Sequence, residues 1–121
     1  PLIPNQVSVH EIVGNVEGRV CLLVDDMIDT GRTIVKAAEA LKKNGATGVV
    51  VAATHAIFSN PAPEILNSEV IDEVVVTDSL PLREEQRFEK LTVLSVAPLL
   101  ATAISEVFKD GSVTSMFDGA A

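Results

Sequence analysis

The sequence predicts an α/β fold with three αβα layers around a mostly parallel sheet. Short apolar runs, typical of buried parallel strands, begin at Val20, Val49, Ile71 and Leu91. Helical apolar spacing follows the first and last runs, and Gly, Asn and Pro mark the turns between them. Alternating strands and helices in 121 residues predict one domain over residues 1–121.

The first strand and helix are predicted between residues 20 and 45. The continuous apolar run Val20–Val24 predicts a strand buried on both faces of the sheet. The following helix, from about Thr33 to Lys43, has apolar residues at i, i+3, i+4 and i+7, namely Ile34, Ala37, Ala38 and Leu41. Asn44-Gly45 is typical of a helix C-terminus.

The later elements follow the same alternation. Further apolar runs predict strands at Val49–His55, Ile71–Thr77 and Leu91–Val96, with a short strand at Val7–Val9. A short helix is expected from Pro61 or Pro63 to about Asn67, and a last one from Pro98 to Gly111. Its apolar stripe comprises Leu99, Leu100, Ala103, Ile104 and Val107. The charged segment Leu80–Arg87 is expected to be a solvated loop.

A candidate ligand site follows the first strand. Two adjacent carboxylates, Asp25 and Asp26, end its apolar run. After Asp29, the turn Thr30-Gly31-Arg32-Thr33 lies at a helix N-terminus, where backbone N–H groups lack intrahelical partners and the dipole end is positive. Because Gly31 permits close approach or positive φ and the Thr hydroxyls add donors, the turn suits a phosphate. The alternative is that Asp29 or Thr30 merely caps the helix.

The acidic pair and the overall charge narrow the ligand class. Neighbouring carboxylates repel a bare phosphate, so Asp25 and Asp26 are expected to accept from sugar hydroxyls or to hold a divalent cation. Phosphate donors beside hydroxyl acceptors predict a phosphorylated sugar. A metal-bound aspartate pair is the competing interpretation, but it leaves the Thr-Gly-Arg-Thr turn unexplained. The net charge of −8 argues against nucleic acid, which requires clustered Lys and Arg.

The cellular location is predicted from the lack of membrane-spanning and signal-peptide features in the sequence. No apolar stretch approaches the ~20 residues needed to span a membrane, and the N-terminus does not look like a signal peptide. The single cysteine, Cys21, predicts a buried, inert thiol. These features predict a cytoplasmic protein with no membrane partner. His55, at the same sheet edge as Asp25, is expected to be structural and is not assigned to the site.

The segment Val24-Asp-Asp-Met-Ile-Asp-Thr-Gly-Arg-Thr33 resembles the ribose-5-phosphate loop of the phosphoribosyltransferase fold. The residue sequence Asp-Asp-Met-Ile-Asp-Thr-Gly within it is particularly similar to that of ribose-phosphate pyrophosphokinases. The likeness continues through Ala52–His55, Phe58-Ser59, Val74–Thr77, Leu94–Leu100 and Gly111–Phe117. It covers essentially the whole chain and points to the C-terminal domain of that family, with a type I phosphoribosyltransferase-like architecture.

The resemblance implies a reaction and its cofactors. The family transfers the diphosphoryl group of ATP to the 1-hydroxyl of ribose 5-phosphate with Mg²⁺, giving phosphoribosyl pyrophosphate and AMP. ATP and metal are implied to bind an N-terminal half absent from this sequence, so no catalytic or metal-binding residue is expected here. The isolated chain is expected to bind the sugar phosphate weakly without turnover. The residues implied to bind it are Asp25, Asp26, Asp29, Thr30, Gly31, Arg32 and Thr33.

One departure and two alternatives stay open. The family usually has a second Gly where this chain has Arg32. An arginine there would add a bidentate phosphate clamp, or would narrow the loop if the position requires positive φ. The alternative functions are a phosphoribosyltransferase and a non-catalytic regulatory subunit of the synthetase. The resemblance also implies a homo-oligomer, a hexamer built from dimers in the full-length enzyme.

Overall fold

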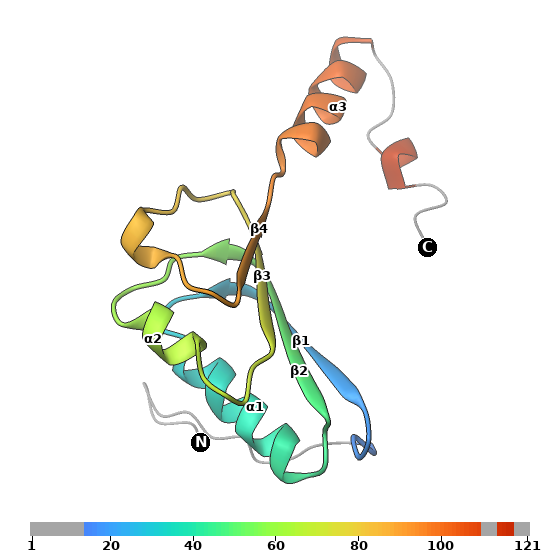
Figure 1. The fold of residues 1–121 in the computed structure, drawn as a ribbon. Helices are drawn as coiled ribbons and strands as arrows, with labels where there is room; N and C mark the ends of the chain where they lie inside the picture. Colours follow the sequence, from blue (N-terminus) through green and yellow to red (C-terminus); the bar gives the residue numbers. More distant parts are fainter. Residues whose placement is uncertain (1–13, 110–113, 118–121) are drawn as a thin grey trace, which may run out of the picture.

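The computed structural model describes residues 14–109 and 114–117 (Figure 1). Its elements are β1 (Val20–Ile28), α1 (Arg32–Lys43), β2 (Gly48–Ala56), α2 (Ala62–Leu66), β3 (Glu73–Thr77), the 3₁₀ helix η1 (Glu84–Gln86), β4 (Leu91–Leu94), α3 (Ala97–Phe108) and the 3₁₀ helix η2 (Thr114–Phe117). The strand predicted at residues 7–9 and the helix end predicted at Gly111 lie outside the described residues. No helix in the described ranges is long and apolar enough to cross a membrane.

The sheet has four strands in the order β1-β2-β3-β4, and every neighbouring pair is parallel. Asp25 pairs with Ala53, and Ala53 pairs with Val76. Because all strands run the same way, their carboxyl ends meet at one edge, where α/β folds bind ligands. The predicted α/β class with a parallel sheet is confirmed.

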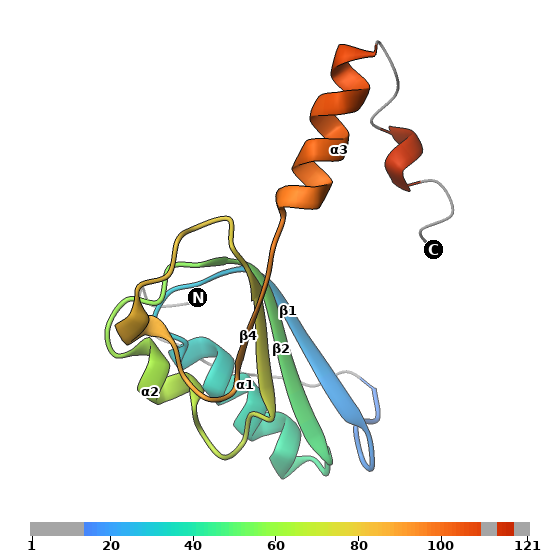
Figure 2. The same ribbon diagram turned by 45° about the horizontal axis from the view of Figure 1, so that its top comes forward.

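One face of the sheet carries the core. Helices α1 and α2 lie against this face (Figures 1 and 2). Alternate residues of β2 and β3 point into it, because side chains of a strand alternate between faces. The buried residues there include Val49, Val51, Val74 and Val76 from the strands, Ile34 and Ala38 from α1, and Ala62 and Leu66 from α2. The predicted stripe of the first helix therefore packs on the sheet, with Ala37 and Leu41 half-buried at its margin.

The opposite face of the sheet is open among the described residues. On β1, Val20 is 69% exposed, Leu22 62% and Val24 72%. The prediction that Val20–Val24 is buried on both faces is therefore wrong for this part of the chain. The run is apolar on both faces, but the described helices cover only one. Cys21 is half-buried rather than buried.

Strand β1 is longer than the sequence suggested. It continues through the acidic pair to Ile28, with Met27 paired to His55 of β2. The carboxylates of Asp25 and Asp26 therefore belong to the strand and do not end it. The reason is that the backbone ladder with β2 sets the strand length, and polar side chains at the sheet edge do not interrupt that ladder.

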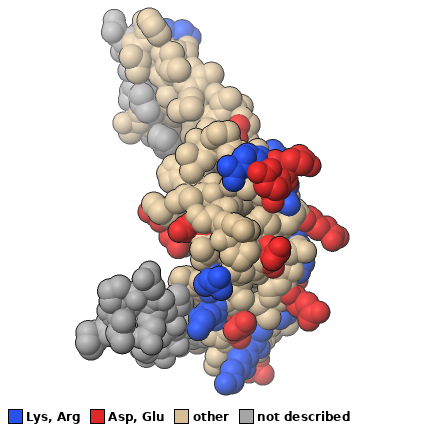
Figure 3. Space-filling model, turned by 90° about the vertical axis from the view of Figure 1, so that its left-hand side faces the viewer, with Lys and Arg blue, Asp and Glu red and all other residues tan. Residues whose placement is uncertain are grey.

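Helix α3 projects from the carboxyl end of the sheet (Figures 1 and 2). Its predicted apolar stripe is present, but no residue of the helix is buried. In the view of Figure 3, charged side chains cover the lower body, whereas the projecting α3 is almost free of them. The helix is thus correctly predicted, while its stripe faces solvent in this chain.

The segment Leu80–Arg87 is more than a solvated loop. It contains η1, and the Gln86 side chain donates hydrogen bonds to the carbonyls of Ile57 and Phe58, at 3.2 and 3.4 Å. Leu82 packs against the core. The expectation of a simple solvated loop is wrong here, because Gln86 and Leu82 attach the segment to the rest of the domain.

Candidate functional site

A cavity of about 200 Å³ lies where β1 ends and α1 begins. It is lined by five of the seven predicted site residues and three apolar ones: Asp25, Asp29, Thr30, Gly31, Thr33, Met27, Ile28 and Ile34. The volume is below the ~300–1,000 Å³ typical of pockets for drug-sized ligands, so it suits a small molecule. The three apolar residues were not predicted as site residues, because their sequence signal is that of ordinary core positions.

Gly31 shapes the loop. It is the N-cap residue of α1, with φ 85° in the left-handed region, and no side chain caps the helix there. Its carbonyl accepts the N–H of Val35 at 2.9 Å, which starts the helical ladder. Thr30 Oγ1 lies 3.5 Å from the N–H of Arg32, at the outer limit of a hydrogen bond. Apart from this long contact with Thr30, the first turn of α1 has no side-chain cap, and the N–H groups of an uncapped helix start favour an anion.

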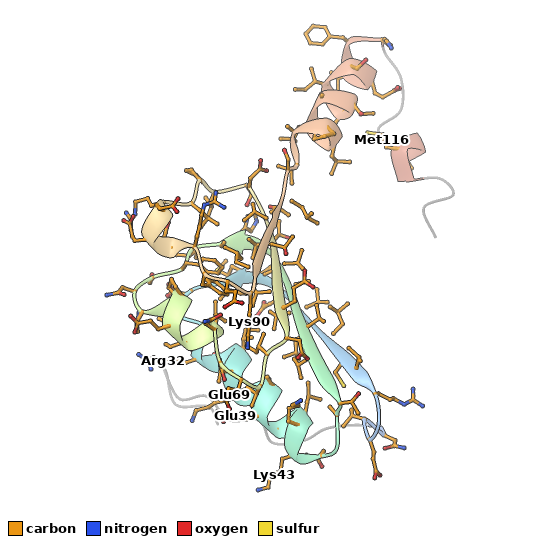
Figure 4. The ribbon with its side chains drawn as sticks, viewed as in Figure 1. Arg32, Glu39, Lys43, Glu69, Lys90 and Met116 are labelled. Carbon is orange, nitrogen blue, oxygen red and sulfur yellow. The ribbon has the colours of Figure 1, made fainter. Side chains whose placement is uncertain are left out.

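Arg32 is the first residue of α1, and its side chain is exposed and directed outward (Figure 4). It does not line the cavity. The left-handed φ of the loop belongs to Gly31, and the only non-glycine residue with positive φ in the described ranges is Phe58. The loop backbone is thus compatible with an arginine at position 32.

The two adjacent carboxylates, Asp25 and Asp26, lie on opposite faces of β1. Neighbouring residues of a strand point to opposite faces, and Asp25 borders the cavity whereas Asp26 does not. The N–H of Asp26 donates to Asp25 Oδ1 at 2.8 Å, so the pair interacts through the backbone. Asp25 is therefore the carboxylate available to a ligand in the cavity.

The magnesium implied by the resemblance can be tested against the donor set. Within residues 14–109 and 114–117 there is no group of three or more His, Cys, Asp or Glu that could hold a metal ion. A magnesium site usually needs one or two carboxylates together with substrate phosphates. The described residues therefore do not fit a magnesium site made by the protein alone.

His55 belongs to a hydrogen-bond network that joins β2 to the segment after β3. Its Nδ1 lies 2.8 Å from Ser79 Oγ. The carbonyl of Thr54 accepts bonds from Thr77 Oγ1 at 2.7 Å and from Ser79 Oγ at 3.2 Å. His55 is half-buried and does not line the 200 Å³ cavity. The structural role expected of His55 stays a prediction, and its printed contact is the one with Ser79.

Comparison with known proteins identifies the family. The model of the phosphoribosyl synthetase-associated domain matches residues 2–118. A ribose-phosphate pyrophosphokinase of Streptomyces avermitilis is 57% identical over 116 residues, covering 96% of this chain and 36% of the relative. The corresponding protein of Mycobacterium leprae is 54% identical over 119 residues, covering 98% and 36%.

A solved structure supports the same assignment. The crystal structure of phosphoribosylpyrophosphate synthetase from Mycobacterium smegmatis superposes with a TM-score of 0.78 at 52% identity, covering 82% of this chain and 33% of that one. The chain spans about a third of the length of these relatives. The matches run along nearly the whole chain, through the Asp-Asp-Met-Ile-Asp-Thr-Gly segment and the fold around it, and the chain belongs to the ribose-phosphate pyrophosphokinase (phosphoribosyl pyrophosphate synthetase) family.

Proposed function

We propose that residues 1–121 form the ribose-5-phosphate-binding, C-terminal part of a ribose-phosphate pyrophosphokinase. The observation that carries the proposal is the cavity of about 200 Å³ that joins Asp25 to the start of α1. It combines a hydroxyl acceptor on one side with phosphate donors on the other. That pair of properties matches a phosphorylated sugar and matches few other small ligands.

Each part of the cavity has a distinct role in this proposal. The backbone N–H groups of the first turn of α1 and the hydroxyls of Thr30 and Thr33 donate to the 5-phosphate. The Asp25 carboxylate accepts from the ribose hydroxyls. Ile28, Ile34 and Asp29 also line the cavity, and in this proposal the two apolar side chains contact the sugar. Asp26 and Arg32 lie outside the cavity and contribute less.

The reaction proposed for the full-length enzyme transfers the diphosphoryl group of ATP to the 1-hydroxyl of the bound ribose 5-phosphate. Phosphoryl-transfer barriers fall chiefly through positioning and neutralisation of charge. No Lys, Arg or His lines the described cavity, so this part of the chain supplies positioning of the acceptor and little of the neutralisation. We therefore propose that ATP and Mg²⁺ bind to further protein, that the isolated chain does not catalyse, and that the full-length enzyme is a cytoplasmic homo-oligomer.

Calorimetric titration of ribose 5-phosphate into the chain tests the proposal. We expect weak binding that Asp25→Asn abolishes. Glu39→Gln, which removes an equal charge from the exposed side of α1, is the matched control and should bind normally. Absence of binding in the wild-type chain, or equal loss in both variants, would contradict the proposal. Inorganic phosphate serves as a second probe, and it should bind Asp25→Asn as well as wild type, because phosphate uses only the helix end.

A further inference from the structure

A chain of hydrogen bonds runs from the Gln86 side chain to the candidate site. Gln86, the last residue of η1, donates from Nε2 to the carbonyl of Ile57 at 3.2 Å and to that of Phe58 at 3.4 Å. Ile57 and Phe58 follow β2, and their own N–H groups both donate to the carbonyl of Ile28, at 3.0 and 3.2 Å. Ile28 ends β1 and lines the cavity of about 200 Å³. Two successive hydrogen bonds therefore connect Gln86 to the wall of the site.

The chain passes through single peptide units. The Ile57 carbonyl and the Phe58 N–H belong to one peptide, which is bonded to Gln86 at one end and to Ile28 at the other. The Ile28 carbonyl and the Asp29 N–H likewise share a peptide. Because a peptide is planar, a carbonyl held in one direction also sets the direction of the N–H on the same unit. Asp29 lines the cavity, and within the described residues its N–H has no partner, so this N–H is available to a ligand.

The turn after β2 has a conformation that needs support. Phe58 has φ 50°, in the left-handed region that a bulky residue rarely adopts. Its side chain is 1% exposed, and its ring centroid lies 5.9 Å from that of Phe88. Such residues persist where the surrounding structure holds them, and they cluster at functional sites. Here one segment supplies the support, because Gln86 binds the backbone of the turn and Phe88 contacts its ring.

The Gln86 amide is itself held in one orientation. Its Oε1 accepts the N–H of Arg83 at 2.8 Å, and its backbone N–H donates to the Arg83 carbonyl at 3.0 Å. A backbone N–H requires the oxygen of the side-chain amide, so the nitrogen must face the two carbonyls. Leu82 and Phe88, on either side of η1, pack against the core. The amide is thus carried by a segment that is fixed to the rest of the domain.

We propose that Gln86 is a positioning residue for the sugar-phosphate site, a role that rests on the function proposed above. Gln86 does not line the cavity and acts through the Ile57–Phe58 peptide on the Ile28–Asp29 peptide. Without its two donors, the left-handed turn at Phe58 loses a support and the Ile28 carbonyl loses its fixed direction. The N–H groups that follow would then be misdirected, so the loss falls on the phosphate end of the ligand.

Two substitutions of Gln86 separate its donors from its acceptor. Gln86→Glu keeps the oxygen that accepts from Arg83 and removes both donors at nearly constant size, whereas Gln86→Lys keeps a donor and removes the acceptor. Arg87→Gln is the matched control, because it changes the net charge by the same one unit at the exposed neighbouring residue. We expect Gln86→Glu to bind ribose 5-phosphate and inorganic phosphate about tenfold more weakly than wild type, and the other two variants to bind within about twofold.

Titration calorimetry measures these affinities, at a temperature where circular dichroism shows each variant folded. Lys90→Met controls for lost stability, since Lys90 bonds to the turn before β3 and not to this chain of bonds. It should bind both ligands like wild type. Normal binding by Gln86→Glu, an equal loss in Gln86→Lys, or an equal loss in Lys90→Met would overturn the positioning role while the wild-type chain still binds. A wild-type chain that does not bind ribose 5-phosphate would instead contradict the proposed function, and this role with it.

Nuclear magnetic resonance of the ligand-free chain tests the hydrogen-bond chain without any ligand. The amide resonances of Phe58 and Asp29 should shift in Gln86→Glu, because the bond between Phe58 and Ile28 weakens, and should stay in place in Arg87→Gln. A purely local role of Gln86 in η1 would leave the Asp29 resonance unchanged, and that result would overturn the proposal.

Discussion

Gly31 lies directly on the side chain of Leu66: a β-carbon at position 31 would come within 2.6 Å of Leu66 Cδ2 and 2.8 Å of Cγ. The same glycine has φ +85°, a conformation that side-chain-bearing residues rarely adopt. Position 31 therefore requires a residue that adopts positive φ and that has no side chain. Since Leu66 belongs to α2, the contact brings the loop of the candidate site against that helix, which also contacts α1.

Gly31→Ala is expected to destabilise the chain by about 2–4 kcal/mol, from about 1 kcal/mol of backbone strain and the rest from overpacking. Gly18→Ala is the matched control, because Gly18 also has positive φ (+72°) but nothing within 4 Å of the added carbon. It should cost about 1 kcal/mol. Urea denaturation measures both. Equal losses would show that the Leu66 contact is unimportant, whereas a smaller loss in a Leu66→Ala background would confirm it.

Arg32→Gly is expected to leave ribose 5-phosphate affinity within about threefold of wild type, which is under 1 kcal/mol. The reason is that Arg32 is outside the cavity and its backbone needs no positive φ. Titration calorimetry measures the affinity. A tenfold gain in the variant would instead show that the arginine obstructs the loop, and a tenfold loss would show that it clamps the phosphate.

Lys90→Met is expected to destabilise the chain by about 1.5–3 kcal/mol, the usual loss for hydrogen bonds to a charged group. Lys90 Nζ donates to the carbonyls of Ser68 and Ile71, each at 2.7 Å, and so ties the turn before β3 to the start of β4 (Figure 4). Lys43→Met, on the exposed end of α1, is the control and should change stability by less than about 0.5 kcal/mol. Similar values for the two variants in thermal unfolding would contradict the role given to Lys90.

Asp78 should make stability depend on pH in the acid range. The N–H of Val96 is the main cause that holds the pKa of Asp78 below its ordinary value of 3.8, and Ser95 adds to it. Because the folded-state pKa is the lower one, the ionised carboxylate stabilises the fold above the ordinary value, and this stabilisation is lost as pH falls through the folded-state pKa. The loss of unfolding free energy caused by Asp78→Asn, relative to wild type, should therefore become smaller below pH ~4. Urea denaturation from acid to neutral pH measures it, with Glu39→Gln as control. If Asp78→Asn lowers the free energy of unfolding by the same amount at every pH, this role of Asp78 is contradicted.

The local elements were predictable because their signals are local. The apolar spacing of Ile34 and Ala38 and the Asn44-Gly45 ending located α1, and the apolar run from Val49 located β2. The loop from Asp29 to Thr33 was identified from residue types that suit an anion at a helix start, and the structure brings its members to one cavity, with Arg32 outside. Boundaries were less accurate, since β1 continues four residues beyond Val24 to Ile28 through backbone pairing that side-chain polarity does not reveal.

The sequence by itself determined the parallel α/β class, the order of strands and helices, and the position of the candidate loop, because periodicity, Gly and capping residues act over a few neighbouring positions. Only the tertiary structure decided which side chains meet. It separated Asp25 from Asp26, assigned the positive φ to Gly31 through Leu66, and left Leu22 and Ile104 uncovered. These outcomes depend on contacts between segments far apart in the chain, and an apolar residue has the same sequence pattern whether or not another surface covers it.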